Sequence, residues 1–418
     1  MKKVESLRGP LALLMESERQ SIQQTSKYVY PLAKPTYGVD EVLGAIDSMV
    51  TFKTSMWEKV RKFEQNFGDE FGGEAIMVNS GSSADLLIAF ALLEASGGHL
   101  APGDEILVPA VTWPTHLWSL VMAGFKVKLV DVSARTLNFD LDSLKHAVSR
   151  QTRAVSVVHL LGNMGDMNAL RAFCSEKDLV LLEDCCEALG SRFSGAHAGS
   201  FGLASSFSFF FSHHMVTMEG GMILTRDADF ANRCRLLRAH GWTRNQFAPV
   251  SSQDFDDRYK FVSWGFNVRP TELQGAFGLS QLKRLDEMNQ KRNANAQFLV
   301  ETIKPHSDFI STMRIHNDVE CNWFAFPMLV NSKAPFTRRN LVDFLEGRGI
   351  ETRPVVAGNL AKQPALKGFP GIRFGELIGA DYVHSNGIYI GIHPEEDFES
   401  LSHVKDALDD FFSVWTQK

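Results

Sequence analysis

A pair of histidines in this chain is placed where acid–base chemistry is possible. His213 and His214 lie in the segment 206–222, which reads SFSFFFSHHMVTMEGGM. An imidazole changes charge near neutral pH and can therefore take up and release a proton during a reaction. A lone histidine in an apolar segment is more often a hydrogen-bonded core residue. The role of His213 therefore depends on the polar residues that accompany it.

A second polar group, Asn79–Ser83, reads NSGSS and follows a predicted strand over 75–78. It is expected to open a helix over 84–93, where free backbone amides and the Ser82 hydroxyl suit a phosphate monoester. Ser208, in an aromatic stretch of the chain, is placed to add a further hydroxyl. A serine-rich helix cap has the same appearance in a sequence. Phosphate binding therefore needs support from other residues.

Two further residues could hold a planar, cationic ring. Trp113 follows the predicted strand 105–108 and could stack on such a ring, although an aromatic side chain that closes the sheet edge gives the same pattern. Asp184 follows the apolar strand 179–183, and a buried carboxylate needs a cationic partner such as a protonated pyridine nitrogen. An N-cap aspartate is the competing interpretation. The chain thus offers a phosphate site, a stacking surface and a carboxylate near the ends of different strands.

The elements that carry these residues alternate between strand and helix. Short β-rich runs are separated by helical patterns, and the runs lie at 75–78, 105–108, 127–132, 154–160 and 179–183. That alternation predicts an α/β fold with a mostly parallel sheet covered on both faces. In such sheets ligands bind at the carboxyl ends of the strands, so the polar residues are expected to meet there.

The remaining segments divide the chain into three expected parts. Residues 1–40 are predicted to be an arm or irregular extension, and residues 41–290 a large α/β domain that begins with helices. An apolar segment followed by a charged one over 273–292 predicts one long helix that leaves this domain. Residues 291–418 are expected to form a smaller C-terminal α+β domain, which ends in an amphipathic helix over 401–415.

Composition and charge exclude several classes of protein. A formal net charge of −6 over 418 residues gives no general attraction to nucleic acid or to an anionic membrane. No apolar run reaches the ~18 residues of a transmembrane helix, and the N-terminal segment makes a poor signal peptide. The five cysteines lack the close spacing of an iron–sulfur site, so no metal site and a reducing, cytoplasmic location are expected.

The polar residues follow one another in the order and approximate spacing of a fold-type I pyridoxal phosphate enzyme: Gly81 with Ser82, Trp113, Asp184, Ser208 and His213. Segment 206–222 resembles the cofactor-lysine segment of the DegT/DnrJ/EryC1/StrS sugar aminotransferase family, and the likeness extends over roughly residues 45–395. The family has a lysine six residues before the glutamate of EGG, where this chain has His213. Imidazole cannot form the Schiff base that lysine forms with pyridoxal phosphate. The chain has no lysine between Lys177 and Lys260 to replace it.

The resemblance implies the aspartate aminotransferase-like fold and a homodimer with shared active sites. In having a histidine in place of the lysine, the chain resembles the family's sugar 3-dehydratases, among them those that act on GDP-4-keto-6-deoxy-D-mannose in colitose biosynthesis. It implies C3 dehydration of a nucleotide-linked 4-keto-6-deoxyhexose, most closely that GDP-sugar, without an iron–sulfur cluster. Pyridoxamine 5′-phosphate is the implied working form of the cofactor pyridoxal 5′-phosphate, and L-glutamate is the implied amino donor.

The resemblance assigns the cofactor's phosphate and one face of its ring to particular residues. Gly81, Ser82 and Ser208 are expected to hold the phosphate, and Trp113 is expected to stack on the ring. Asn267, in the segment GFNVR, is expected to contact the phosphate from the partner subunit. That last contact exists only if the chain forms the dimer.

Four further roles follow from the same resemblance. Asp184 is expected to pair with the pyridine nitrogen, which makes the ring an electron sink, and Glu187 is expected to lie beside the ring. His213 is the expected proton-transfer residue. Arg353, in the segment ETRP, is expected to bind the carboxylate of glutamate or the sugar diphosphate, unless it is a surface arginine.

Two other functions fit parts of the same pattern. A sugar aminotransferase that works without the covalent lysine would leave nitrogen on its product, whereas a dehydratase would not. A non-catalytic protein that binds pyridoxal phosphate would be expected to have lost ring-binding residues. Asp184, Trp113 and Ser208 are all in place, which favours an enzyme.

Overall fold

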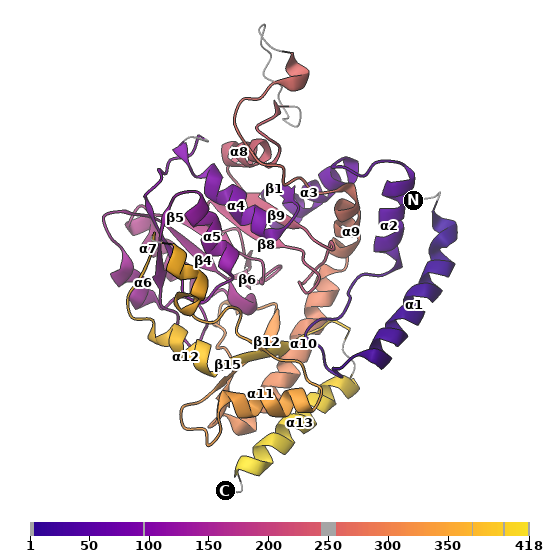
Figure 1. Cartoon of the computed structure of the whole chain (residues 1–418), viewed down its shortest axis with the longest axis vertical. Coiled ribbons are helices and arrows are strands. Elements are labelled where there is room, and N and C mark those ends of the chain that lie inside the picture. Colours follow the sequence, from indigo (N-terminus) through magenta and orange to yellow (C-terminus); the bar gives the residue numbers. More distant parts are fainter. Residues whose placement is uncertain (1–3, 95–96, 244–255, 370, 396–397, 417–418) are drawn as a thin grey trace.

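An eight-stranded sheet forms the centre of the protein (Figure 1). The computed structural model describes residues 4–94, 97–243, 256–369, 371–395 and 398–416. The strand order is β1-β9-β8-β5-β4-β2-β3-β14, and only β9 runs antiparallel to its neighbours. The strands are β1 (Glu74–Val78), β2 (Glu105–Pro109), β3 (Lys126–Val130), β4 (Thr152–Val158), β5 (Val180–Asp184), β8 (Ala204–Ser208), β9 (Gly221–Thr225) and β14 (Ile372–Phe374). The mostly parallel α/β sheet predicted from the sequence is confirmed.

Side chains of one strand alternate between two hydrophobic cores, one on each face of the sheet. In β1, Ile76 and Val78 belong to one core, whereas Ala75 and Met77 belong to the other. Such a strand is apolar throughout because neither face meets water. Helices α4 (Gly81–Ala91), α5 (Pro114–Met122) and α8 (Ala228–Arg238) supply residues to the first core. The second core is completed by α3 (Glu58–Phe71), α6 (Leu141–Ala147) and α7 (Met167–Glu176).

The single long helix expected over 273–292 is wrong, because the segment forms two helices. Helix α9 (Glu272–Leu282) ends before α10 (Leu285–Ile303) begins. Arg284 caps the start of α10 with ψ near zero (φ −108°, ψ −1°), and its side chain donates a hydrogen bond to the carbonyl of Thr36 at 3.0 Å. The break contains no glycine or proline, so the helical periodicity of the sequence gives no sign of it.

The C-terminal part of the chain has its own sheet, with every strand pair antiparallel and the order β10-β12-β15-β13. Its strands are β10 (Ile310–Ser311), β12 (Ala325–Val330), β13 (Arg353–Pro354) and β15 (Gly387–Gly391). Helices α11 (Arg338–Gly347), α12 (Ile378–Asn386) and α13 (Phe398–Thr416) accompany it, and α13 confirms the expected C-terminal helix. Strand β14 leaves this part and pairs with β3 of the large sheet.

Smaller elements complete the chain. A three-stranded sheet consists of β6 (Arg192–Phe193), β7 (Ala196–His197) and β11 (Val319–Glu320). The 3-10 turns are η1 (Glu5–Leu7), η3 (Leu160–Gly162), η5 (Asp257–Tyr259), η6 (Lys304–His306), η7 (Leu360–Lys362) and η8 (Pro364–Gly368). None of the described helices has both the length and the apolar character needed to cross a bilayer.

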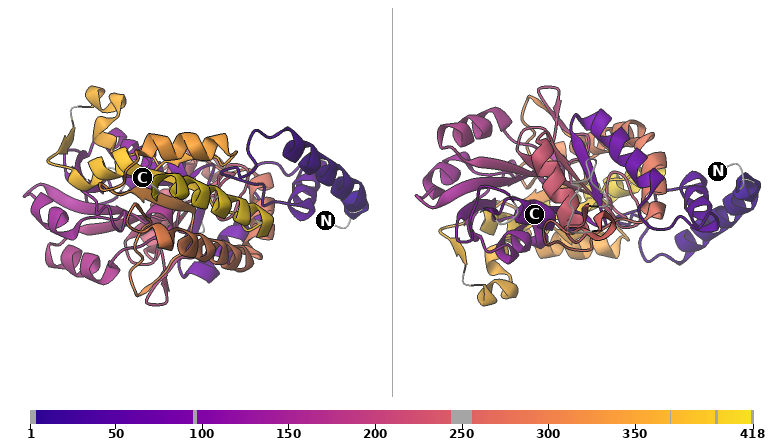
Figure 2. Two further views of the ribbon diagram at one scale, coloured as in Figure 1. Left: turned by 90° about the horizontal axis from the view of Figure 1, so that it is seen from below. Right: turned by 90° about the horizontal axis from the view of Figure 1, so that it is seen from above.

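The described part of the N-terminal extension is largely helical, so of the two expectations, an arm or an irregular extension, the irregular extension is wrong over most of its length. Helix α1 (Arg8–Thr25) has no buried residue and lies with α2 (Val39–Val50) at the periphery (Figure 2). The segment after α1 returns to the body of the protein. Tyr30 is fully buried; its N–H donates to the carbonyl of Gly349 at 3.0 Å and its hydroxyl to the carbonyl of Gly391 at 3.0 Å. These bonds hold the following residues, Leu32 and Ala33, at the edge of the candidate site.

Candidate active site

A cavity of about 770 Å³ opens where the carboxyl ends of the large sheet's strands face the C-terminal sheet. All the predicted site residues except Asn267 line it: Gly81, Ser82, Trp113, Asp184, Glu187, Ser208, His213 and Arg353. Residues that the sequence did not single out also line it, among them Leu32, Ala33, Asp85, Thr115, Cys186, Phe324, Glu351 and Tyr389. Leu32 and Ala33 come from the N-terminal extension, which therefore forms part of the cavity wall.

The start of α4 forms one end of the cavity and fits a phosphate group. The Ser80 hydroxyl accepts the N–H of Ser83 at 3.1 Å, whereas the N–H groups of Gly81 and Ser82 have no hydrogen-bond partner among the described residues. Unpaired amides at a helix start attract an anion. The backbone also comes very close to β8 here, because a Cβ atom on Gly81 would lie 2.6 Å from the Cβ of Ser208. Glycine thus brings the amides and the Ser208 hydroxyl together.

The floor and one wall of the cavity fit a planar ring with a cationic nitrogen. Asp184, at the end of β5, is 5% exposed, and its carboxylate accepts the N–H of Cys186 at 3.0 Å. A buried carboxylate gains stability from a cationic partner such as a pyridinium nitrogen. Trp113, at the start of α5, is 57% exposed and lines the cavity, so its ring face is available for stacking. The residues present therefore fit the expected cofactor.

Asp85 brings a second carboxyl to the floor, and the sequence analysis missed it. Burial raises the pKa of Asp85 well above its usual value, and the nearby charge of Asp184 raises it further. Burial and the nearby carboxylate of Asp184 thus both favour the neutral form of Asp85. Asp85 lies four residues after Gly81 on the same helix. That spacing, which places two residues on one helix face, could have identified it.

Glu187 carries a proton that exchanges near neutral pH. Its carboxylate accepts the N–H of Leu161 at 2.9 Å. Burial raises the pKa of Glu187 to about 7, the hydrogen bond from Leu161 opposes this, and the charge of Asp184 adds to it. A carboxyl group with such a pKa can act as either a proton donor or a proton acceptor in the cavity.

His213 lies in the turn that follows β8, where its imidazole is uncharged. The backbone N–H of His213 donates to the carbonyl of Phe210 at 2.9 Å. Its imidazole ring lies edge-on to the ring of Phe324, with the two centroids 5.1 Å apart. Burial, followed by the charge of Arg292, lowers the pKa of His213 to about 3. His214 is fully buried outside the cavity lining, where its Nε2 lies 3.0 Å from the carbonyl of Asn322. Of the two adjacent histidines, only His213 therefore faces the cavity.

Arg353 and Asn267 differ in how the structure places them. The guanidinium of Arg353 reaches the cavity edge and donates to Glu351 at 2.7 Å, and Glu351 also accepts the N–H of Leu32 at 2.9 Å. Arg353 is thus tied through Glu351 to the N-terminal extension. Asn267 does not line the cavity, and its side-chain oxygen accepts a hydrogen bond from Arg269 at 2.9 Å. Its role at a partner's site stays a prediction.

One buried group of metal-ligating side chains lies behind the site, formed by His159, Glu183 and Cys185. The Glu183 carboxylate already accepts the His159 Nε2–H at 2.9 Å and backbone N–H groups at 2.7 to 2.9 Å, those of Gly199, Phe201 and Gly202. These bonds satisfy both oxygens. The group has a single thiol, whereas an iron–sulfur cluster needs about four.

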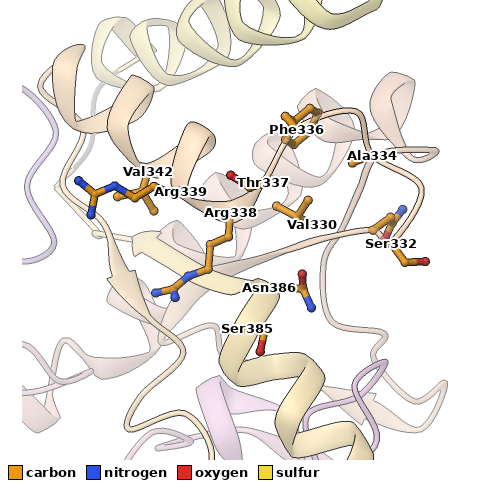
Figure 3. A pocket seen from close by; sticks show the side chains of 11 residues that line it. Val330, Ser332, Ala334, Phe336, Thr337, Arg338, Arg339, Val342, Ser385 and Asn386 are labelled. Atoms are coloured by element: carbon orange, nitrogen blue, oxygen red, sulfur yellow. The ribbon is translucent and has the colours of Figure 1, made fainter.

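A second hollow of about 600 Å³ lies in the C-terminal part around the start of α11 (Figure 3). Phe336 and Arg338 are among the side chains that border it. The lining contains hydroxyls, an amide pair and arginines but no carboxyl group or imidazole. This hollow therefore lacks the groups suited to acid–base chemistry.

The comparisons with known proteins point to one family. Residues 40–409 match the DegT/DnrJ/EryC1/StrS aminotransferase family. The GDP-4-keto-6-deoxy-D-mannose 3-dehydratase of Escherichia coli O55:H7 is 39% identical over 388 residues, which cover 91% of this chain and 99% of that protein.

Two solved structures are similar over most of this chain. A GDP-4-keto-6-deoxymannose-3-dehydratase with a trapped PLP-glutamate geminal diamine has a TM-score of 0.87 and 36% identity, and the match covers 91% of this chain and all of the other. A mutant of such an enzyme with bound GDP-perosamine has a TM-score of 0.86 and 37% identity, with the same coverage.

The raised pKa of Glu187 makes stability depend on pH in a defined direction. The folded protein keeps this carboxyl protonated up to about pH 7, whereas an unfolded chain releases the proton near pH ~4.3. The folded state is therefore favoured at low pH and loses that advantage as pH rises through about 7. We expect Glu187→Gln to remove this loss, measured as the free energy of unfolding in urea from about pH 5 to pH 8. Glu320→Gln, at an exposed glutamate, is the control. A constant difference between wild type and Glu187→Gln across the range would contradict the assignment.

Proposed function

We propose that this chain, which belongs to the DegT/DnrJ/EryC1/StrS aminotransferase family, is a sugar 3-dehydratase rather than an aminotransferase. It removes the C3 hydroxyl of GDP-4-keto-6-deoxy-D-mannose and gives the 4-keto-3,6-dideoxy sugar. It uses pyridoxal 5′-phosphate in its aminated form, with L-glutamate as the amino donor. The observation that carries this function is His213, an uncharged imidazole in the cavity at the place of the family's lysine.

The cofactor, when bound, supplies an amine that condenses with the C4 ketone and a ring that accepts electrons. In the proposed arrangement the amides of Gly81 and Ser82 and the hydroxyl of Ser208 hold its phosphate. Trp113 covers one ring face, and Asp184 keeps the ring nitrogen protonated. These contacts would hold the ring at the strand ends, beside the turn that carries His213.

His213 performs the proton transfers of the reaction. Its neutral imidazole would take up a proton at C4′ of the bound cofactor, whose ring would supply the electron sink that allows the C3 hydroxyl of the sugar to leave. Without a lysine in the cavity lining, the aldehyde form of the cofactor is not captured by the protein. The cavity residues would therefore leave the cofactor available for re-amination by glutamate. Arg353 lies at the cavity edge, where it can bind the glutamate carboxylate or the sugar's diphosphate.

The product distinguishes the dehydratase from the aminotransferase. We expect purified protein with pyridoxal phosphate, glutamate and GDP-4-keto-6-deoxy-D-mannose to form a sugar nucleotide lighter by one oxygen atom and without nitrogen on the sugar. One glutamate should be consumed and one ammonia released per product, as measured by mass spectrometry and an ammonia assay. The CDP-linked 4-keto-6-deoxyhexose tests the choice of nucleotide. A product that keeps its C3 hydroxyl and gains an amino group would identify an aminotransferase instead.

Replacement of His213 tests the proton-transfer role. We expect His213→Asn to lower kcat by about 10²-fold or more, the usual contribution of a general acid–base group. Pyridoxamine phosphate should still bind, since the residues for its phosphate and ring nitrogen are unchanged. His214→Asn is the matched control, because His214 lies outside the cavity lining. The assignment fails if His213→Asn dehydrates the sugar at a rate near that of wild type.

The proposed working unit is a homodimer in the cytoplasm. The segment just before Asn267 exposes apolar side chains, those of Tyr259, Phe261, Val262 and Trp264. Clustered apolar residues at a surface are typical of an interface. In this arrangement Asn267 reaches the phosphate of the partner's cofactor. The described cysteines are unpaired thiols, which suits the reducing cytoplasm.

Mixing two impaired variants, at a cofactor concentration too low for Asn267→Ala to bind it, tests whether the sites are shared. We expect light scattering to give the mass of a dimer, and Asn267→Ala to weaken cofactor binding. An equimolar mixture of His213→Asn and Asn267→Ala should regain activity after subunit exchange, since one site of each heterodimer then has both residues. A mixture of His213→Asn and Asp184→Asn is the control, because both residues belong to the same subunit's site. Recovery in neither mixture, with exchange verified, would refute shared sites.

A further inference from the structure

Arg292 is a buried cation in the part of the chain that the sequence presents as a charged surface helix. It lies on α10 and is 3% exposed. No carboxylate of the described residues forms an ion pair with it. Burial lowers the pKa of Arg292 to about 10, so it remains charged at neutral pH. A buried charge without a counter-ion is costly, so its hydrogen bonds are expected to serve a purpose.

The guanidinium of Arg292 joins three separate segments of backbone. It donates to the carbonyl of Ile392 at 2.5 Å, to that of Phe324 at 3.4 Å and to that of His213 at 3.3 Å. Ile392 follows β15 and Phe324 precedes β12, so two of these carbonyls belong to the C-terminal sheet. Arg292 thereby fastens the turn that carries His213 to the opposite side of the cavity.

The charge of Arg292 acts on the His213 imidazole as well as on its backbone. After burial, Arg292 is the cause that lowers the pKa of His213, and it also lowers the pKa of His214. The other ionisable groups around the imidazole are His214 beside it and, along the cavity, Asp85, Asp184, Cys186, Glu187, Glu219, Glu351, Arg353 and Tyr389. A positive charge in a buried site disfavours a second one nearby.

We propose that Arg292 is a positioning residue for the dehydration: it fixes the His213 turn through a backbone hydrogen bond and keeps the imidazole free to accept a proton. The role rests on the proposed function, in which His213 is the base. Arg292 itself touches neither cofactor nor substrate in this arrangement, because it does not line the cavity.

Two variants separate the charge of Arg292 from its shape. Arg292→Met removes the charge and keeps a side chain of similar length, a change that proteins often tolerate at buried ionic sites. Arg292→Lys keeps the charge but loses the planar fork that reaches several carbonyls. Lys291→Gln removes a neighbouring charge on the same helix, where Lys291 is exposed and pairs with Glu287. It is the control for a general change in helix charge.

The decisive measurement is the pKa of His213 in the full-length protein, with and without pyridoxamine phosphate. NMR of histidine-labelled protein reports it, and the His213→Asn spectrum identifies the signal. We expect Arg292→Met to raise the pKa of His213 by about 1 unit or more, the usual effect of one nearby charge. The acid limb of kcat/KM should move to higher pH in the same variant. Arg292→Lys and Lys291→Gln should leave the pKa of His213 low.

Two results would overturn the proposal. One is an unchanged pKa of His213 in folded Arg292→Met. The other is a pKa near the ordinary ~6.5 in the wild-type protein, which needs no variant and so remains decisive if Arg292→Met does not fold. The NMR titration requires no substrate or turnover. A protein that catalyses a different reaction would therefore still answer whether Arg292 controls His213.

Discussion

The close contact between the start of α4 and the end of β8 is the constraint on which the site depends. A Cβ atom on Gly81 would meet Ser208, and one on Gly221 would lie 2.3 Å from the carbonyl oxygen of Ser80. Two glycines on opposite sides of the same junction let a helix start press against the ends of β8 and β9. If α4 moved outward, the free amides and the Ser208 hydroxyl would no longer lie together, and the phosphate site proposed there would be lost. Asp184 and Trp113 can contact the ring of a bound cofactor only if its phosphate is held at the start of α4.

Burial then gives the cavity's ionisable groups different protonation states at one pH. It lowers the pKa of His213 to about 3 and raises that of Glu187 to about 7. It also raises the pKa of Asp85, and the charge of Asp184 adds to that effect. The site therefore contains a free base and a carboxyl that exchanges its proton near neutrality. Groups whose environments push their pKa values apart in this way can divide the donor and acceptor roles of one reaction.

Much of the site could be predicted because its residues follow strands. Strand ends of a parallel sheet meet at one edge, so Asp184 and Ser208 could be placed together without knowledge of the loops. Asp85 and Arg292 were missed because each lies inside a helix, where a charged residue is usually solvent-exposed. Lys291 is exposed and Asn293 is half-buried, and only its place on the helix face buries Arg292. Leu32 and Ala33 were missed because their position depends on contacts between Tyr30 and residues more than 300 positions away.

The surroundings of His213 also explain how one exchange of side chain can change the reaction. The cavity wall at this position combines burial with the nearby charge of Arg292. A lysine there would meet the same two effects, and both favour the neutral amine that forms a Schiff base. The environment therefore favours an uncharged side chain at this position, whether that side chain is lysine or histidine. An imidazole can accept a proton but cannot form a Schiff base, so in the proposed function the same cavity residues would serve dehydration without a covalent link between cofactor and protein.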